Sequence, residues 1–204
     1  ASLSAVAGFH IARGALACGI VPQRDESWLN SFLDAKEKME SRQLRILALD
    51  GISDTANLGS MIRCSAAFGI DVIVLSNDCC DAWYRRSVRV SMGHIFNVPI
   101  VRVDDLAGTI RNNFSSSKRS IASYAAVIDL DAELVLEQIG KGEIPQRWCC
   151  VMGNEGNGIS KNVAMACTSR LRIDMVHGVD SLSVPIATGI LLHGIKEREK
   201  SHEQ

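Results

Sequence analysis

The feature that most restricts the fold of this chain is a repeated pairing of segments, in which a short apolar run is followed by an amphipathic stretch. The run RILALDG at 45–51 is almost continuously apolar and ends in glycine, which is typical of a strand buried on both faces of a parallel sheet. An amphipathic helix is expected over 57–68, with Gly69 placed to end it. A second apolar run, DVIVLS, follows at 71–76. These segments predict a βαβ unit with a right-handed crossover.

The same alternation continues along the chain and places it in the α/β class. Further helices are expected at 25–39, 82–93, 105–113, 131–139 and 184–198. Further strands are expected at 98–103, 121–126, 148–152 and 171–175, with a low-complexity loop at 114–120. The sequence contains no internal repeat and no linker that would separate two domains. We therefore predict one domain at 44–204 with a mostly parallel sheet and helices on both faces, preceded by a helical extension at 1–43 that packs on it.

The charge of the chain limits how it can contact nucleic acid. Its 22 Lys and Arg residues against 23 Asp and Glu residues give a formal net charge of −1, and its pI is about 6.6. A protein that holds nucleic acid through bulk positive charge neutralises many phosphates with Lys and Arg. Any nucleic-acid contact made by this chain is therefore expected to be local.

The cysteines and the apolar segments indicate a compartment. Seven cysteines include two adjacent pairs but no CxxC and no histidine at zinc-ligand spacing, so no metal site is expected. Their odd number favours a reducing intracellular compartment, the cytoplasm first, with an organelle or the nucleus left open. No apolar run is long enough to span a membrane, and the stretch at 5–21 is interrupted by His10 and Arg13, which indicates packed structure instead of a signal core. The chain starts at Ala1, so the earlier removal of an address sequence stays open.

Ligands of an open α/β sheet bind where strands end, and the first loop of interest there is DGISDTANLGSMIR, from Asp50 to Arg63. Asn57 can cap the expected helix, and Gly59 lets another group approach the backbone, so both residues also have a structural explanation. Arg63 is harder to explain structurally, because a guanidinium on the first turns of such a helix needs an anion or a carboxylate as partner. The alternative to a bound anion is a salt bridge to Asp50 or Asp54.

The second loop is VMGNEGNGIS at 151–160, between an expected strand and an expected helix. Its three glycines let the backbone turn tightly around a ligand and present bare N–H and C=O groups to it. The loop has no GK[ST] and does not match GxGxxG, so it is not a phosphate-binding loop of either kind. Glu155 argues against a bound phosphate and tolerates a cation. The alternative is a plain glycine turn.

The third loop is HGVDSLSVPIATGI at 177–190, which leads into the last expected helix. Pro185 suits the first turn of that helix and Ser183 its cap, so simple helix initiation is one explanation. Asp180 and Ser181 have no such structural explanation.

In this order the three loops resemble the motifs of the SpoU (TrmH) family of SPOUT methyltransferases, over residues 44–195. The first family motif, NxGxxxR, is met by Asn57, Gly59 and Arg63. The second is met by MGNEGNGI, and the third, of the form DSLNVSVAAGILL, by DSLSVPIATGILL. The basic segment that precedes the second motif is met by YRRSVRVSMGHIFNVPIVRV. One such motif alone would be weak evidence for the family, but three motifs in the family's order make a specific match.

The resemblance implies a fold with a deep trefoil knot at its C-terminal end, an exception to the rule that chains do not thread themselves. It implies that S-adenosylmethionine binds in this knot and that the protein is a homodimer with sites built across the interface. It also implies transfer of the methyl group to a ribose 2′-hydroxyl of rRNA or tRNA. The expected partners are thus RNA and a second copy of the chain, with no membrane and no DNA.

The family's catalytic positions correspond here to Asn57, Arg63, Glu155 and Ser181. Arg63 matches the arginine proposed to act on the 2′-hydroxyl, and Ser181 matches the serine that helps to orient it. Because arginine stays protonated at ordinary pH, we expect Arg63 to stabilise a developing alkoxide or to anchor the adjacent phosphate, and not to act as a base. The cofactor is expected to contact strand ends and the glycine loop at Leu75, Met152, Gly153, Asn154, Gly156, Gly158, Ile173, Leu182 and Ser183.

Two groups of basic residues are expected to contact RNA. Arg85, Arg86 and Arg89 cluster on one face of a helix, because they stand at i, i+1 and i+4. Lys118 and Arg119 lie in the serine-rich loop. The alternative for both groups is a solvated surface.

Two departures from the third motif leave a second hypothesis open. Ser183 stands where the family usually has Asn, and Pro185 where it has a second Ser. The shorter side chain at 183 loses the reach of an amide, and Pro185 removes a backbone N–H. The alternative function is therefore a catalytically silent RNA-binding or assembly protein that keeps the fold and the dimer.

Overall fold

The computed structural model describes residues 17–39, 43–116, 119–176, 178–179 and 181–200. Its centre is a seven-stranded sheet in the order β3-β2-β1-β6-β4-β7-β5, in which all neighbouring strands are parallel. The strands are β1 (Leu44–Asp50), β2 (Val72–Ser76), β3 (Ile100–Val103), β4 (Ala122–Ala126), β5 (Leu134–Val135), β6 (Arg147–Gly153) and β7 (Ser169–Arg172). The predicted α/β class with a mostly parallel sheet is confirmed.

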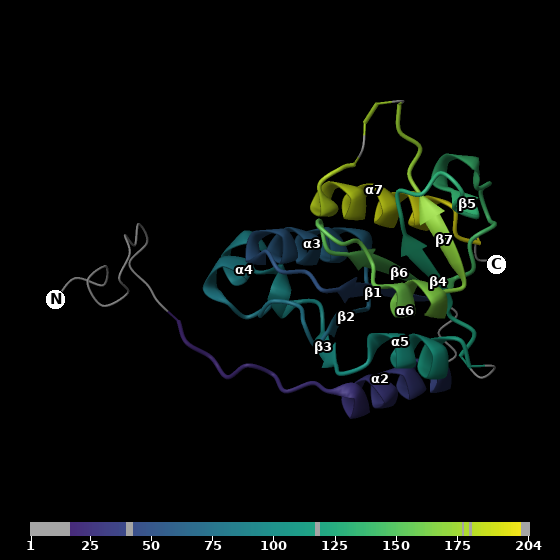
Figure 1. Cartoon of the computed structure of the whole chain (residues 1–204). Helices are drawn as coiled ribbons and strands as arrows, with labels where there is room; N and C mark the ends of the chain where they lie inside the picture. Colours follow the sequence, from purple (N-terminus) through teal and green to yellow (C-terminus); the bar gives the residue numbers. More distant parts are fainter. Residues whose placement is uncertain (1–16, 40–42, 117–118, 177, 180, 201–204) are drawn as a thin grey trace.

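Helices cover both faces of the sheet, with α3 and α7 on one side of it and α2 and α5 on the other (Figure 1). The helices are α2 (Glu26–Lys38), α3 (Thr55–Phe68), α4 (Arg85–Val90), α5 (Leu106–Thr109), α6 (Lys161–Ala166) and α7 (Val184–Glu197). The shorter turns are η1 (His94–Phe96), η2 (Ile110–Phe114) and η3 (Leu136–Gln138). Each face has its own apolar cluster, with Leu58 and Leu191 in the first and Leu33 and Phe114 in the second. Because both faces are covered, the central strands β1 and β2 are almost continuously apolar.

The segment before the sheet contributes α2 to the second cluster. The Asp25 side chain caps this helix by accepting a hydrogen bond from the Trp28 N–H at 3.0 Å, and Leu29 and Leu33 are fully buried. Residues 1–16 and 40–42 lie outside the described residues. The division into an extension and a domain at residue 43 stays a prediction, as does the trefoil knot.

Two of the expected helices are altered by their surroundings. The helix expected at 82–93 spans only Arg85–Val90, since Met92 and Gly93 have left-handed φ angles of 54° and 85° that end it. The helix expected at 105–113 is a short α-helix followed by the π-helical turn η2. Asp105 caps it by accepting the Gly108 N–H at 2.9 Å.

The prediction of a helix at 131–139 is wrong. This segment forms the edge strand β5 and then the turn η3, with Leu134 opposite Leu171 and Val135 opposite Arg172. Pairing with β7 holds the chain extended, so a tertiary contact overrides the local helical pattern. Periodicity within one segment carries no information about a strand that comes later in the chain.

The packing of α4 against α3 depends on Gly59. A Cβ atom at this position would lie 2.7 Å from the Ser87 carbonyl oxygen and 2.8 Å from the Val90 Cβ. We expect Gly59→Ala to destabilise the fold by about 1–3 kcal/mol, because the two helices must move apart. Gly189→Ala in α7 is the matched control, since its nearest neighbour, the Cys64 Sγ, is at an ordinary 3.7 Å. Urea unfolding of both variants checks this, and equal midpoints would contradict it.

Candidate functional site

The loops that carry the first two sequence motifs follow neighbouring strands of the sheet. β1 and β6 are neighbours, and their last residues, Asp50 and Gly153, stand opposite each other in the register. The loops that follow these strands therefore start about 5 Å apart, at the carboxyl edge where open sheets bind ligands.

The glycine loop closes on itself as a tight hairpin. The Asn154 N–H donates to the Gly158 carbonyl at 3.1 Å, and the Gly158 N–H donates back to the Asn154 carbonyl at 2.8 Å. The Asn154 Oδ1 also accepts the Gly156 N–H at 2.7 Å. Gly153 has to be glycine, because a Cβ there would overlap the backbone of Gly158 and Ile159. Glu155 is left exposed at the tip of this hairpin.

Side chains join this hairpin to the first motif. The Asn57 Nδ2 donates a hydrogen bond to the Glu155 Oε1. The Asn154 Nδ2 donates to the Gly51 carbonyl at 2.8 Å and to the Ser53 Oγ at 3.3 Å. The structure thus brings the first two motifs into contact through Asn57 and Glu155, which are 98 residues apart in the sequence.

The expected capping role of Asn57 is wrong, and this frees its side chain for Glu155. The N-cap of α3 is Asp54, whose carboxylate accepts the N–H groups of Ala56 at 2.7 Å and of Asn57 at 2.9 Å. These backbone hydrogen bonds, first that of Asn57, hold the pKa of Asp54 below its ordinary value despite the opposing effect of burial, and the charge of Arg86 adds to them.

Arg63 lies on α3 with its side chain exposed. Six residues of α-helix place it about 9 Å along the axis from Asn57. The expected alternative partners are engaged elsewhere, since Asp54 caps α3 and the Asp50 Oδ2 accepts the Ser160 N–H at 2.7 Å. Within the described part of the chain, Arg63 forms no ion pair.

The predicted cofactor residues come from three strand ends and from the segment before α7. Met152 and Gly153 end β6, the other hairpin residues follow it, and Ile173 follows β7. One strand separates β6 from each of the other two, which is β4 on the side of β7 and β1 on the side of β2, so Leu75 lies about 10 Å from Met152 across the sheet. Ser181 and Ser183 are exposed and Leu182 is half-buried in the segment before α7, while Asp180 lies outside the described residues.

Sequence reasoning missed the segment that follows β4. This strand lies between β6 and β7, and its last residue, Ala126, stands opposite Leu171. The Val127 N–H continues the pairing by donating to the Leu171 carbonyl at 3.0 Å. The sequence did predict a strand at 121–126, and the end of this strand was the signal that could have pointed to the segment. Only the strand order shows that this end lies between the loops that follow β6 and β7.

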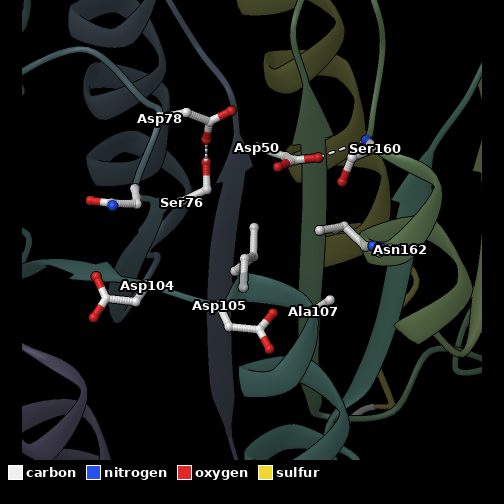
Figure 2. Close-up of a pocket in the computed structure, with 11 residues that line it drawn as sticks. Asp50, Ser76, Asp78, Asp104, Asp105, Ala107, Ser160 and Asn162 are labelled. Atoms are coloured by element: carbon white, nitrogen blue, oxygen red, sulfur yellow. Dashed lines mark hydrogen bonds between the residues drawn. The ribbon is translucent and has the colours of Figure 1, made fainter.

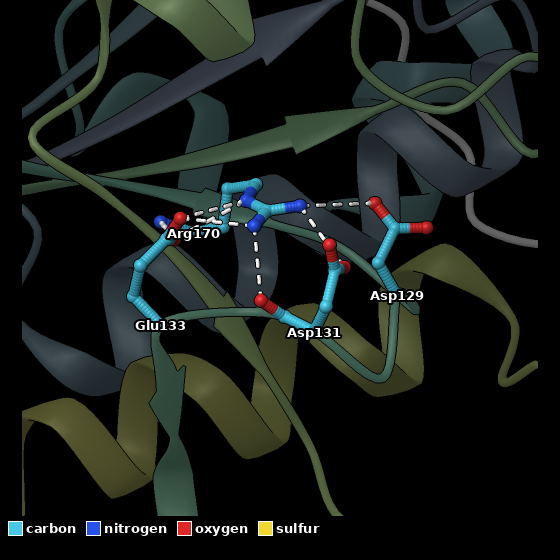
Figure 3. A network of polar contacts seen from close by, with 4 residues as sticks. All are labelled: Asp129, Asp131, Glu133 and Arg170. Carbon is cyan, nitrogen blue, oxygen red and sulfur yellow. Dashed lines mark hydrogen bonds and ion pairs between the residues drawn. The ribbon is translucent and has the colours of Figure 1, made fainter.

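One arginine fixes this segment (Figure 3). The Arg170 guanidinium forms ion pairs with Asp129 at 3.7 Å, Asp131 at 3.1 Å and Glu133 at 2.9 Å. The side-chain hydrogen bonds from Arg170, together with its backbone N–H, lower the pKa of Glu133 to about 2. The loop after β4 is therefore tied to the start of β7.

We expect Arg170→Gln to raise the pKa of Glu133 from about 2 towards its ordinary value of 4.5. Because the pKa of Glu133 is lower in the folded protein than in the unfolded chain, the interaction between Arg170 and Glu133 stabilises the fold fully above the unfolded pKa. This stabilisation is lost as the pH falls towards 2. Carboxyl-carbon NMR titration measures the shift. Arg172→Gln is the control, since Arg172 pairs with Asp174 at 2.7 Å and its loss should leave the Glu133 pKa unchanged.

A separate cavity of about 360 Å³ opens at the ends of β1, β2 and β3, against α5 and α6 (Figure 2). It is acidic, with Asp50, Asp78, Asp104 and Asp105 in its lining, and none of the predicted site residues lines it. Asp78 accepts a hydrogen bond from the Ser76 hydroxyl. In the described ranges, no three or more His, Cys, Asp or Glu side chains are arranged to hold a metal ion. The cavity thus touches the motif loops only at Asp50, where the first begins, and at Ser160, where the second ends.

The predicted RNA-contacting residues also separate. Arg85, Arg86 and Arg89 are exposed on α4. Arg119 is only 9% exposed, and its guanidinium pairs with Asp34 of α2 at 3.0 Å and donates to the Asn30 Oδ1 at 3.1 Å. The expectation that it contacts RNA is wrong, because it anchors α2 instead, whereas Lys118 lies outside the described residues.

The cysteines are free thiols. Burial raises the pKa of Cys150 and of Cys167 to about 12, so neither is poised to react as a thiolate. Among the helices that the structure describes, none has the length and apolar character needed to cross a membrane.

Comparison with known proteins gives a consistent family. Residues 44–193 match the model of the SpoU rRNA Methylase family. An uncharacterized tRNA/rRNA methyltransferase of Mycobacterium tuberculosis is 30% identical over 200 residues, which cover 98% of this chain and 64% of that protein. A 23S rRNA (guanosine-2′-O-)-methyltransferase of Salmonella typhi is 30% identical over 154 residues, 75% of this chain and 60% of that protein. The chain thus spans less than two thirds of the length of these relatives.

Solved structures give the same result. A putative RNA methyltransferase of the TrmH family from Porphyromonas gingivalis has a TM-score of 0.66 and 31% identity, and the match covers 77% of this chain and 61% of that one. An AdoMet-bound rRNA methyltransferase from Sinorhizobium meliloti has a TM-score of 0.65 and 28% identity, over 79% of this chain and 59% of that one.

Proposed function

Because the chain belongs to the SpoU rRNA methylase family, we propose that it transfers a methyl group from S-adenosylmethionine to a ribose 2′-hydroxyl of rRNA or tRNA. The observation that carries this proposal is the hydrogen bond from Asn57 of the first motif to Glu155 of the second. It supports a shared site because it places both motifs at one edge of the sheet.

The residues around the glycine hairpin fit the cofactor. Adenosine is held by apolar walls and a few backbone donors and acceptors. Ile128 and Leu130 after β4 are 61% and 87% exposed, and Val176 and Val179 after β7 are 77% and 44% exposed, so apolar surface is available on both sides. The hairpin backbone, Ile173 and Leu182 would complete the walls. When bound, the cofactor supplies an electrophilic methyl group on a sulfonium.

The protein's own part in the reaction is to position and to stabilise. Displacement at a methyl group requires the acceptor oxygen to be held in line, and such positioning contributes several kcal/mol. The 2′-hydroxyl must lose its proton to solvent water during attack, and a guanidinium at Arg63 would stabilise the alkoxide that develops. Asn57 would hold Glu155, and Ser181 would orient Arg63.

We further propose that the protein is a homodimer whose sites combine both copies. Ile186 and Ile190 stand at i and i+4 on α7 and are 56% and 37% exposed, so α7 offers a second copy an uncharged apolar face. Arg63 lies on α3, which packs against α7, about 9 Å along its helix from Asn57. A second copy on this face would bring its own glycine loop towards Arg63.

The catalytically silent alternative rests on Ser183 and Pro185. Pro185 stands in the first turn of α7, where a backbone N–H has no partner within the helix, so it removes no helical hydrogen bond. Ser183 occupies the N-cap position but makes no capping hydrogen bond, which leaves its hydroxyl available to a ligand. Both positions are thus compatible with an active enzyme.

Calorimetric titration with S-adenosylmethionine, followed by mapping of ribose methylation in total rRNA and tRNA, tests the proposal. We expect saturable binding and new 2′-O-methyl groups. Binding without methylation would favour the silent alternative, above all if Ser183→Asn then produced activity. Absence of both would contradict the proposed function.

A further inference from the structure

An exposed surface next to α4 combines aromatic rings with arginines. Tyr84, directly before α4, is 55% exposed, and Phe96 in η1 is 72% exposed. Arg85, Arg86 and Arg89 are exposed on α4 itself. We call these five residues the aromatic–arginine surface. Exposed apolar groups that gather beside charged side chains are typical of interaction sites.

The Phe96 ring is held in place. It packs against Trp83 with ring centroids 6.0 Å apart, and Trp83 in turn packs against the first apolar cluster. The loop before α4 is fixed as well, because Arg102 donates hydrogen bonds to the carbonyls of Cys79 at 2.9 Å and Cys80 at 3.0 Å. A ring supported in this way loses little conformational freedom when a flat ligand stacks on it.

The charge of the surface is local and positive. Three arginines within five positions contrast with a net charge of −1 for the whole chain. The acid nearest in sequence is Asp81, which accepts the Trp83 N–H at 2.9 Å, and the charge of Arg86 also acts on Asp54, which caps α3. The three arginines outnumber these two carboxylates. Guanidinium groups bind phosphates, and exposed rings stack on bases. An RNA duplex would use the arginines but leave the rings uncovered, because its bases are already stacked.

The start of α3 connects this surface to the candidate site. The charge of Arg86 acts on Asp54, which caps α3 at Asn57, and Asn57 donates to Glu155. Gly59 lets α4 lie directly against α3. RNA bound on α4 would therefore lead to the start of α3.

A second copy of the chain fits this surface less well. A two-fold interface brings the same patch of both copies together, so the arginines would face arginines. A two-fold interface through the uncharged face at Ile186 and Ile190 would bring no like charges together.

On the basis of the proposed function, we propose that the aromatic–arginine surface binds an unpaired segment of the RNA substrate by stacking bases on Phe96 and Tyr84 while Arg85, Arg86 and Arg89 hold its phosphates. The substrate class is thus a loop, bulge or end, and not a continuous duplex. This goes beyond local basic contacts, because it assigns the selectivity for unpaired RNA to the rings.

Fluorescence anisotropy with the full chain tests this on an RNA of about 12 nucleotides, single-stranded or annealed to its complement at the same salt concentration. We expect tighter binding of the single strand, and Phe96→Leu or Tyr84→Leu to weaken it about 10-fold while duplex binding stays unchanged. Tyr84→Phe, which keeps the ring, should bind like the wild type. Arg89→Gln should weaken both forms alike.

Equal losses for both RNA forms, or no loss in the leucine variants, would overturn the proposal. A shifted dimer dissociation constant in sedimentation, with unchanged RNA affinity, would assign the surface to a second copy instead and would overturn it too. If the wild type methylates RNA but the ring variants bind normally, only this inference fails. If ring-dependent binding persists without binding of S-adenosylmethionine, only the proposed function fails.

Discussion

Arg63→Ala is expected to methylate ribose about 10²–10³-fold more slowly than the wild type, with unchanged affinity for S-adenosylmethionine. Removing a donor that faces charge developing in a transition state has effects of this size. Arg63 is exposed and forms no ion pair within the described ranges, so its loss should leave the fold intact. Single-turnover methylation and calorimetry separate the two quantities.

Arg63→Lys is the matched control. It keeps a positive charge but not the planar donor fork, so an intermediate rate is expected. Full activity of the alanine variant would remove Arg63 from the chemistry. A loss of cofactor binding equal to the loss of rate would show that it supports the cofactor pocket and not the transition state.

Mixed dimers decide whether Arg63 serves its own subunit or the other. Neither Arg63→Ala nor Glu155→Ala dimers should be active alone. If the arginine acts across the interface, a mixed dimer of the two has one intact site, and random mixing restores about one quarter of the wild-type rate. If it acts within its own subunit, mixing restores nothing.

Glu199→Ala is expected to cause the largest loss of stability, about 3–5 kcal/mol. The Glu199 side chain is 7% exposed and accepts hydrogen bonds from the Arg45 Nε at 2.6 Å, the Trp148 Nε1 at 2.5 Å and the Gln43 Nε2 at 2.9 Å. It ties the segment after α7 to the starts of β1 and β6, and Lys200 adds a backbone hydrogen bond to Ile144 at 2.9 Å. Without the carboxylate, Arg45 is left as a buried charge with no counter-ion at this contact.

Urea or thermal unfolding measures this loss, with Glu197→Gln as the control, since Glu197 is exposed at the end of α7, two residues before Glu199. A stability equal to that of the control would show that the C-terminal segment is not needed to hold the strands.

The same carboxylate predicts a pH dependence. Burial opposes ionisation of Glu199, but the hydrogen bonds from Arg45 and Trp148 outweigh it and hold its pKa below the ordinary 4.5. Its contribution is therefore complete above pH 4.5 and is lost as the pH falls through the lowered pKa. Glu199→Gln should remove this part of the acid sensitivity.

The sequence predicted which side chains gather at the ends of the strands better than it predicted their contacts. The motif spacing identified Asn57 and Glu155, yet Asn57 was expected to cap a helix, and Asp54 does so instead. Arg119 was expected to contact RNA because it follows a serine-rich loop, but it is paired with Asp34. The sequence does not distinguish a helix cap at position 54 from one at position 57. Nor does it distinguish an exposed arginine from a buried one, because burial depends on which distant segment packs over the side chain.

The sequence by itself determined the class of fold and most of its strands, because central strands covered on both faces are almost continuously apolar and a crossover helix is amphipathic. It also predicted that the loops after β1 and β6 meet, which the hydrogen bond between Asn57 and Glu155 bears out. Only the tertiary structure decided that β4 lies between β6 and β7, that 131–139 contains an edge strand, and that Arg45 meets Glu199 across 154 residues. Local periodicity records what one segment buries, whereas strand order and ion pairs are set by contacts between segments far apart in the chain.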